Sequence, residues 1–443
     1  MSEMGEMAFV APEPEEPKEP KEIKDETIKI RFSLFFDGTC NNRTNTDHRL
    51  NVANEVLPEA ERQASIAIYE KHQGDDSYEN DYSNVAKMEK YINDAEGYGL
   101  TLKSYIEGPG TTDHEGDSSV GYGMGMGKSG VRNKVEQGLQ DVINLIAENH
   151  TNKKTIIELL TLDVFGFSRG AAGARNFIHE ALNGDKLTPV KTLLEEKGYQ
   201  VGKVEVDFVG LYDTVSAHGV VYANDVNDLK LRAVRHAKRV VQLAAAEEHR
   251  KNFSLTTIQC AGQPKGREIF LPGVHSDIGG SYVDNSAEEQ VVFHGPQWMA
   301  VQDREALIAS GWYQPHEIDL IELPSGPHGL SINAMVTVKR EGIRNHYSRI
   351  PLHIMANFAR ENAINIKTKL ESANKIPGKL EGTKERIDNY IKNTPHSKSE
   401  HWQHNEGWLK ALRNDYLHFS AKYEFGLGPR FKDGKRYRKQ YAG

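Results

Sequence analysis

Short strand-like hydrophobic runs recur along the chain, each closed by turn residues. From Ile28 the run IKIRFSLFF combines β-branched and aromatic residues and ends at Asp37-Gly38, which predicts the first strand. Further apolar runs bounded by turns predict strands at 102–106, 155–165, 204–212 and 268–272.

Between these runs, apolar residues recur at helical spacing. Two such series each share one face: Val131, Val135, Leu139, Val142 and Ile146, then Ala171, Ala174, Phe177, Ile178 and Leu182. Strands that alternate with helices of this length are typical of βαβ units. We therefore expect an α/β fold with a mostly parallel central sheet flanked by helices.

The pattern divides the chain into four parts. Residues 1–26 are rich in Pro, Glu and Lys and predict a disordered tail, whereas 27–284 predict the α/β core. Residues 285–430 predict a mostly helical C-terminal layer packed on the core, with helices near 303–310, 352–370, 383–392 and 406–420. Residues 431–443 predict a solvated basic tail.

Composition and charge exclude several classes of protein. The 443 residues carry 55 Lys and Arg against 63 Asp and Glu, a net charge of −8, so we expect no nucleic acid partner. No apolar run approaches the roughly 18 residues of a membrane span. The first ten residues lack a signal-peptide pattern, which predicts synthesis in the cytoplasm without a cleaved leader. The two cysteines predict free thiols.

The sequence Gly166-Phe-Ser168-Arg-Gly170 is a GxSxG motif between a predicted strand and a predicted helix. This is the context of a nucleophile elbow, in which a strained turn exposes the serine hydroxyl. We predict Ser168 as the nucleophile, Gly166 and Gly170 as the residues that leave room for the turn, and the N–H of Arg169 as an oxyanion donor. The alternative is a tight turn with an ordinary capping serine.

A serine nucleophile needs a histidine base and a carboxylate that orients it. Asp213 follows the predicted strand 204–212, and His275 lies in a glycine-rich loop after the strand 268–272, so the order is that of α/β-hydrolases. Asp277 is a second candidate for the carboxylate, or it braces the histidine loop. Less favoured candidates are Asp207, Asp225 and Asp228 for the acid, and His218 and His249 for the base.

The first strand leads into Asp37-Gly38-Thr39-Cys40-Asn41-Asn42, and we assign the second oxyanion donor to the N–H of Gly38, with Asp37 in support. An Asx-type turn and a hard-cation site are the alternatives. The glycine run 121–130 fails the Walker A pattern because Tyr122 stands where the first glycine belongs, and it predicts a loop at the mouth of the site. We expect no metal ion and no organic cofactor.

Taken together, these motifs resemble a known group. FFDGTCNN, SNVAKM, YIEGPGT, GFSRGAAGAR, GLYDTVS, LPGVHSDIGGSY, NHYSRIPLHIMA and LHFSAKY, from about Ile28 to Arg430, are similar to successive blocks of the first family of lipase effectors of bacterial type VI secretion systems. The resemblance implies an α/β-hydrolase fold. It also implies Ser168 as nucleophile, Asp213 as acid and His275 as base.

The resemblance further implies a phospholipase that cleaves acyl esters of membrane glycerophospholipids in a rival bacterium. Delivery would use spike or tube proteins of the secretion system, the site of action would be the target-cell membrane or periplasm, and an immunity protein would protect the producer. Two alternatives stay open: a soluble carboxylesterase of the same fold, and a non-catalytic cargo or adaptor that binds secretion proteins through residues 11–26.

Overall fold

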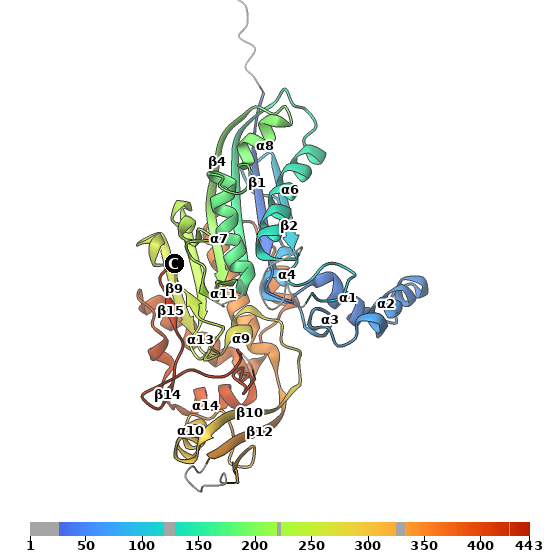
Figure 1. The fold of residues 1–443 in the computed structure, drawn as a ribbon. Helices are drawn as coiled ribbons and strands as arrows, with labels where there is room; N and C mark the ends of the chain where they lie inside the picture. Colours follow the sequence, from blue (N-terminus) through green and yellow to red (C-terminus); the bar gives the residue numbers. More distant parts are fainter. Residues whose placement is uncertain (1–25, 119–128, 219–222, 325–332, 425) are drawn as a thin grey trace, which may run out of the picture.

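A six-stranded parallel sheet forms the centre of the molecule (Figure 1). Its order is β2-β1-β3-β4-β7-β9, and each neighbouring pair is parallel. The strands are β1 Thr27–Phe36, β2 Leu100–Ile106, β3 Ile156–Phe167, β4 Val201–Tyr212, β7 Arg239–Ala245 and β9 Gly266–Leu271. The five predicted strands are therefore confirmed. Strand β7 was not predicted, because a short apolar run fits a buried helix as well as a strand.

The structure, a computed structural model, describes residues 26–118, 129–218, 223–324, 333–424 and 426–443. The predicted N-terminal tail lies outside the described residues except for Glu26. The glycine run 121–130 also lies outside them except for its last two residues.

The two faces of the sheet are covered by different helices. Along β1, Phe32, Leu34 and Phe36 point to the face covered by α6 Val131–Asn149 and α7 Ser168–Leu182. Phe35 points to the other face, which is covered by the C-terminal half of the chain, including α11 Arg349–Glu361. The alternation follows from the two-residue period of a strand, and both faces are apolar because the sheet is buried on both sides.

Three helices project from the carboxyl end of β1 (Figure 1). They are α1 Arg43–Val52, α2 Glu59–His72 and α3 Asp76–Glu79. The N-cap side chain of Asn42 accepts the N–H groups of Thr44 and Asn45, which fixes where α1 begins.

The C-terminal layer contains a second sheet, which the sequence analysis did not predict. Strands β10 Ser286–Pro296, β12 Asn333–Ile343 and β11 Ile318–Glu322 form an antiparallel sheet in that order. In β12 the buried residues Ala334, Val336 and Val338 alternate with more exposed ones, the period of a strand rather than of a helix. The C-terminal layer thus contains this sheet beside its helices.

The remaining elements are short or lie at the periphery. They are α4 Asn84–Glu89, α8 Val190–Glu196, α9 His275–Gly279, α10 Gln297–Ala309, α12 Lys369–Ala373, α13 Gly378–Asn393, α14 Gly407–Asp415, β5 Ala217–His218, β6 Ala223–Asn224, β8 Leu255–Thr256, β13 Phe431–Lys432, β14 Lys435–Arg436 and β15 Gln440–Tyr441. Among the described residues, no helix is both long enough and apolar enough to cross a bilayer.

Residues 431–443 are not a solvated tail, which corrects the sequence prediction. Strand β15 pairs in parallel with β8, and Arg436 and Arg438 form buried ion pairs with Asp303 and Asp213. A segment rich in charged residues can be buried in this way when each inward-facing cation meets a carboxylate.

The carboxyl ends of the sheet strands gather the candidate residues. Asp37 follows β1, Ser168 follows β3, Asp213 follows β4, and His275 lies shortly after β9. In parallel α/β sheets ligands bind at this edge, because the loops that leave the strands converge there.

Candidate active site

Ser168 lies at an abrupt turn from strand to helix. Strand β3 ends at Phe167 and helix α7 begins at Ser168 itself, with no residue between them. The φ angle of Ser168 is 57°, in the left-handed region that non-glycine residues rarely adopt. The serine is thus held in a strained conformation at the N-terminus of a 15-residue helix.

The glycines of the motif allow close backbone approaches. A Cβ on Gly166 would lie 2.6 Å from the Cα of Ala171, and a Cβ on Gly170 would overlap the carbonyl oxygens of Phe36 and Asp37. Strand β1 and helix α7 can therefore approach this closely only if residue 170 has no side chain.

We predict that Gly170→Ala lowers the free energy of unfolding by ~1–3 kcal/mol, because the new methyl group meets backbone that cannot move aside. Gly173→Ala, in the same helix, is the matched control, since its Cβ would lie 3.7 Å from Phe36, an ordinary contact. It should leave stability unchanged or raise it by about the ~1 kcal/mol helix preference of alanine over glycine. Urea unfolding of both variants measures the difference, and equal effects would contradict the close approach at Gly170.

Asp213 is buried and meets four donors. Its backbone lies in the left-handed region, with φ 47°, and its side chain is fully buried. Oδ1 accepts the N–H of Ala245 at 2.8 Å and Nη1 of Arg438 at 2.6 Å, while Oδ2 accepts Nδ1 of His275 at 2.5 Å and Nη2 of Arg438 at 2.8 Å. Burial alone would raise the pKa of Asp213, but Arg438 and His275 bring it to about 2.

His275 is the first residue of α9 and is also buried. Because an ionised carboxylate can only accept, the 2.5 Å contact with Asp213 places the proton on Nδ1 and leaves Nε2 as the acceptor. The rings of Phe167 and Phe253 lie with their centroids 4.7 and 5.0 Å from the imidazole. Burial lowers the pKa of His275, and Asp213 offsets this only in part.

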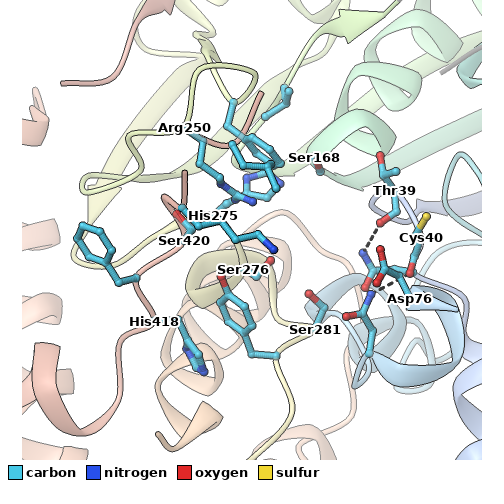
Figure 2. Close-up of a pocket in the computed structure, with 18 of the residues that line it drawn as sticks. Thr39, Cys40, Asp76, Ser168, Arg250, His275, Ser276, Ser281, His418 and Ser420 are labelled. Atoms are coloured by element: carbon cyan, nitrogen blue, oxygen red, sulfur yellow. Dashed lines mark hydrogen bonds between the residues drawn. The ribbon is translucent and has the colours of Figure 1, made fainter. Parts of the chain in front are cut away.

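Ser168 and His275 border one pocket of about 500 Å³ (Figure 2). Within the part of the chain that the structure describes, no hydrogen bond joins the Ser168 hydroxyl to the imidazole. Such bonds are often long in unliganded hydrolases and shorten in the substrate complex. The structure thus links the imidazole to Asp213 directly and brings it to the same pocket as Ser168.

A second buried ion pair supports the histidine loop. Glu248 accepts the backbone N–H of His275 at 3.3 Å and binds Arg250 through both carboxylate oxygens, at 3.0 and 2.8 Å. The guanidinium of Arg250 lies 3.3 Å from the ring centroid of Phe253. Burial would raise the pKa of Glu248, but Arg250 more than reverses this. Sequence reasoning missed this group, since nothing local marks it.

The N–H of Gly38, the predicted second oxyanion donor, is hydrogen-bonded to the neighbouring residue. This N–H donates to Oδ1 of Asp37 at 2.7 Å, so that donor is already engaged in this conformation. Asp37 is buried and also accepts the hydroxyls of Ser83 and Tyr105, at 2.8 and 2.7 Å. Burial raises the pKa of Asp37 to about 6 despite these bonds. The bond from Gly38 reaches only the neighbouring side chain, whereas an Asx turn spans two residues, as the side chain of Asn42 does when it accepts the N–H of Thr44 at 2.9 Å.

The N–H of Arg169 belongs to the first turn of α7, where backbone donors point out of the helix. The Arg169 side chain donates from Nε to the hydroxyl of Thr39 at 2.6 Å, and both residues border the pocket. The role of the Arg169 N–H as an oxyanion donor stays a prediction.

Asp277 does not contact the imidazole through any hydrogen bond among the described residues. Its carboxylate accepts the N–H of Val274 at 3.0 Å and contacts Nδ1 of His418 at 2.8 Å. It therefore ties the start of α9 to the chain near residue 418, which is the bracing role that the sequence analysis left open.

The less favoured candidates lie elsewhere. Asp207 pairs with Arg31 and Lys238, each at 3.1 Å, and Asp228 pairs with Arg132 on the surface. His249 is half-buried, and desolvation and then nearby arginines such as Arg436 lower its pKa to about 3.

The sequence analysis also missed Arg438, which lies 225 positions from the aspartate that it binds. The sequence does contain a pattern that indicates burial of Arg438. Arg436 and Arg438 are two residues apart, the spacing of one face of an extended segment, and both side chains are buried.

Among the residues that the structure describes, one group of side chains away from the pocket has ligand atoms close enough to hold a metal ion: His179, Glu180 and Asp185. Oε2 of Glu180 already accepts three backbone N–H groups, those of Asp185, Lys186 and Leu187. This carboxylate is thus occupied in holding the turn after α7, and the group does not bear on the pocket.

Residues 180–302 match the family model described as the catalytic domain of Tle1-like phospholipase effectors of type VI secretion systems. The matched range contains Asp213 and His275, whereas Ser168 precedes it. None of the curated proteins matches the chain.

Among solved structures, the chain is similar to the Tle1 effector bound to the VgrG spike from the type VI secretion system. The two are 25% identical over 90% of this chain and 85% of that chain, with a TM-score of 0.61. An uncharacterized protein from Pseudomonas aeruginosa is 17% identical over 84% of this chain and 52% of that chain, with a TM-score of 0.47. The family match and the likeness to Tle1 confirm the resemblance found in the sequence and, with the parallel sheet, the α/β-hydrolase-like fold.

Proposed function

We propose that the protein is a serine phospholipase effector of a type VI secretion system, with Ser168 as nucleophile, Asp213 as acid and His275 as base. The observation that carries the proposal is the buried Asp213–His275 bond at a pocket that Ser168 also borders, in a chain whose residues 180–302 match the Tle1-like catalytic domain. Ester hydrolysis by a serine enzyme requires a nucleophile, a base and an acid that orients the base. Here each of the three follows a different strand.

In the proposed mechanism, Nε2 of His275 removes the hydroxyl proton of Ser168 as Oγ attacks the ester carbonyl carbon. The negative charge on the carbonyl oxygen faces the N-terminus of α7 and the N–H of Arg169, which would stabilise it. His275 then protonates the leaving lysolipid oxygen, and an acyl-serine remains. Water attacks this ester with the same base, so that a fatty acid leaves and the serine recovers its proton.

The walls of the pocket support an acyl substrate. Phe167, Val215, Phe253, Phe419 and Leu427 supply apolar side chains around the serine. A volume of about 500 Å³ falls within the range of small-ligand sites, so part of one acyl chain and the ester fit inside it. The rest of a phospholipid would stay outside, and two cations, Arg250 and Lys422, also line the pocket.

The likeness to a Tle1 chain solved with its VgrG spike supports a spike protein as the partner of this chain. We infer delivery through the secretion system, action at the membrane or in the periplasm of the target cell, and a cognate immunity protein in the producer.

The substrate is tested with vesicles of phosphatidylethanolamine and phosphatidylglycerol, analysed by mass spectrometry. We expect lysophospholipid and free fatty acid in equal amounts. A short-chain p-nitrophenyl ester is assayed in parallel. Turnover of that ester alone would identify a carboxylesterase, and turnover of neither substrate would favour the non-catalytic adaptor.

The pH dependence follows from the base. His275 must be neutral to accept a proton, and its pKa lies below the ordinary value of 6.5 because burial disfavours the imidazolium. Activity is therefore present above this pKa and is lost as the pH falls through it. We expect the acid limb of kcat/KM to have its midpoint below pH 6.5, measured with the soluble ester to avoid effects of pH on vesicles. A midpoint above pH 7 would contradict this assignment.

A further inference from the structure

Residues 435–443, named here the C-terminal strap, run along the active-site side of the core. Strand β14 leads to β15, which pairs with β8 in the register Gln440–Leu255 and Tyr441–Thr256. Backbone bonds continue on both sides: the N–H of Leu255 donates to the carbonyl of Lys439 at 3.0 Å, and that of Cys260 to the carbonyl of Gly443 at 3.1 Å. The strap is thus held by main-chain bonds as well as by its side chains.

Arg438 connects this strap to the triad aspartate. Its side chain is only 5% exposed. Its guanidinium spans both oxygens of Asp213, at 2.6 and 2.8 Å, and also donates to the carbonyls of Phe253 at 2.8 Å and Ala245 at 3.2 Å. One side chain therefore joins the end of β7, the segment before β8 and the acid.

The donors around Asp213 account for all of its acceptor capacity. A carboxylate offers about four lone-pair positions. The N–H of Ala245 takes one, Arg438 takes two, and Nδ1 of His275 takes the last. The plane of the carboxylate is thus fixed, and the one remaining acceptor position is directed at the imidazole.

We propose that Arg438 is a positioning residue of the active site, and that docking of the C-terminal strap completes the triad by fixing the carboxylate of Asp213 and, through it, the ring of His275. The inference rests on the proposed serine-hydrolase function. Without the guanidinium fork, the carboxylate can rotate and offer His275 a poorly aligned oxygen, so that Nε2 is no longer directed at Ser168. A misplacement of about 1 Å in an active site can cost roughly 10²-fold in rate.

The pH dependence of kcat/KM provides a second measurement. A residue with only a structural role would leave it unchanged. Three charged groups act on the imidazole: Asp213 after β4, and Glu248 and Arg250 from the segment after β7. Arg438, from the strap, binds both oxygens of Asp213. The carboxylate of Asp277, which lies on α9 with His275, is bonded to Val274 and His418 instead of the imidazole. Without Arg438, the carboxylates of Asp213 and Glu248 are balanced by only one guanidinium, that of Arg250. The imidazolium then becomes more favourable, and the acid limb of kcat/KM should move to higher pH.

The experiment uses the full chain and a fluorophosphonate probe, which needs no knowledge of the natural substrate. Serine Oγ bonds to phosphorus, the phosphorus–fluorine bond breaks, and fluoride leaves while the base takes the proton. The labelling rate and kcat/KM on a soluble ester are measured between pH 5 and 9 for wild type, Arg438→Met, Arg438→Lys and Arg436→Met.

We expect Arg438→Met to lower both rates by ~10- to 100-fold, mainly in kcat, and to move the acid limb upward. Arg438→Lys keeps the charge without the fork, so its rates should fall while its acid limb stays near that of wild type. Arg436→Met is the matched control, because it removes the neighbouring buried pair with Asp303, at 2.7 and 2.8 Å. It should lower the thermal midpoint and leave the acid limb unchanged.

Each outcome separates the two claims. A wild-type protein that the probe does not label overturns the serine-hydrolase function and this inference with it. A labelled wild type with unchanged rates and acid limb in Arg438→Met overturns the inference alone. If Arg438→Met does not fold, Arg438→Lys decides: rates equal to wild type would overturn the positioning role. Equal shifts of the acid limb in the Arg436 and Arg438 variants would also overturn it.

Discussion

Ser168→Ala is expected to lower kcat by about 10⁶-fold, the loss that follows removal of the nucleophile from a serine hydrolase. The attacking oxygen is gone, and the small residual rate comes from binding and from the donors around the oxyanion. Alanine fits this position less well than glycine would, since φ is 57°, but it adds no atoms to the strained turn that serine already occupies. The variant should therefore fold.

The measurement is release of fatty acid from vesicles, combined with growth of bacterial cells that export the protein to the periplasm. Ser276→Ala is the control, since that hydroxyl borders the same pocket but lies at no strand–helix turn, and we expect only a small change in its kcat. Hydrolysis or toxicity of the Ser168 variant at the level of wild type would contradict the enzyme claim and leave the adaptor alternative.

Asp213→Asn is expected to lower kcat by ~10⁴-fold, through loss of the correct imidazole tautomer. The structure adds a reason specific to this site. An asparagine has one acceptor oxygen and one donor NH₂, yet donors face both sides of residue 213. In one orientation the NH₂ meets His275 and Arg438, and in the other it meets Ala245 and Arg438. In either orientation, the NH₂ group therefore faces donors that have lost their acceptor.

The same substitution leaves Arg438 buried without its carboxylate, so we also expect a loss of stability of ~3–5 kcal/mol, measured by urea unfolding. Asp277→Asn is the matched control for kcat, because that carboxylate lies two residues from the base but bonds to Val274 and His418. It should cost much less activity. A larger loss in Asp277→Asn than in Asp213→Asn would transfer the acid role to Asp277.

Local pattern predicted most of the central sheet because each strand is a short apolar run closed by turn residues. It missed β7, where the run Arg239–Ala245 has no strong turn signal of its own, and the antiparallel sheet β10-β12-β11. In β12 the alternation spans residues with charged and polar side chains between the buried ones, so a search for apolar periodicity does not find it.

The order of Ser168, Asp213 and His275 could be proposed from sequence, since each follows a predicted strand and parallel strands end at one edge of the sheet. The donor at Gly38 could not be judged in this way. Whether its N–H is available depends on where the carboxylate of Asp37 points, and that depends on Ser83 and Tyr105 from other elements.

By itself, the sequence determined what depends on neighbours along the chain: the strand before Ser168, the helix after it, the glycines that allow the turn, and the order of the three candidate residues. Only the tertiary structure decided what depends on direction and distance between remote segments. It placed Arg438 on Asp213 across 225 positions, paired the N–H of Gly38 with Asp37, and showed that part of the expected solvated tail is a strand paired with β8. The reason is physical: hydrophobic periodicity is a local average, whereas a hydrogen bond or a buried ion pair needs two specific groups to meet within about 3 Å.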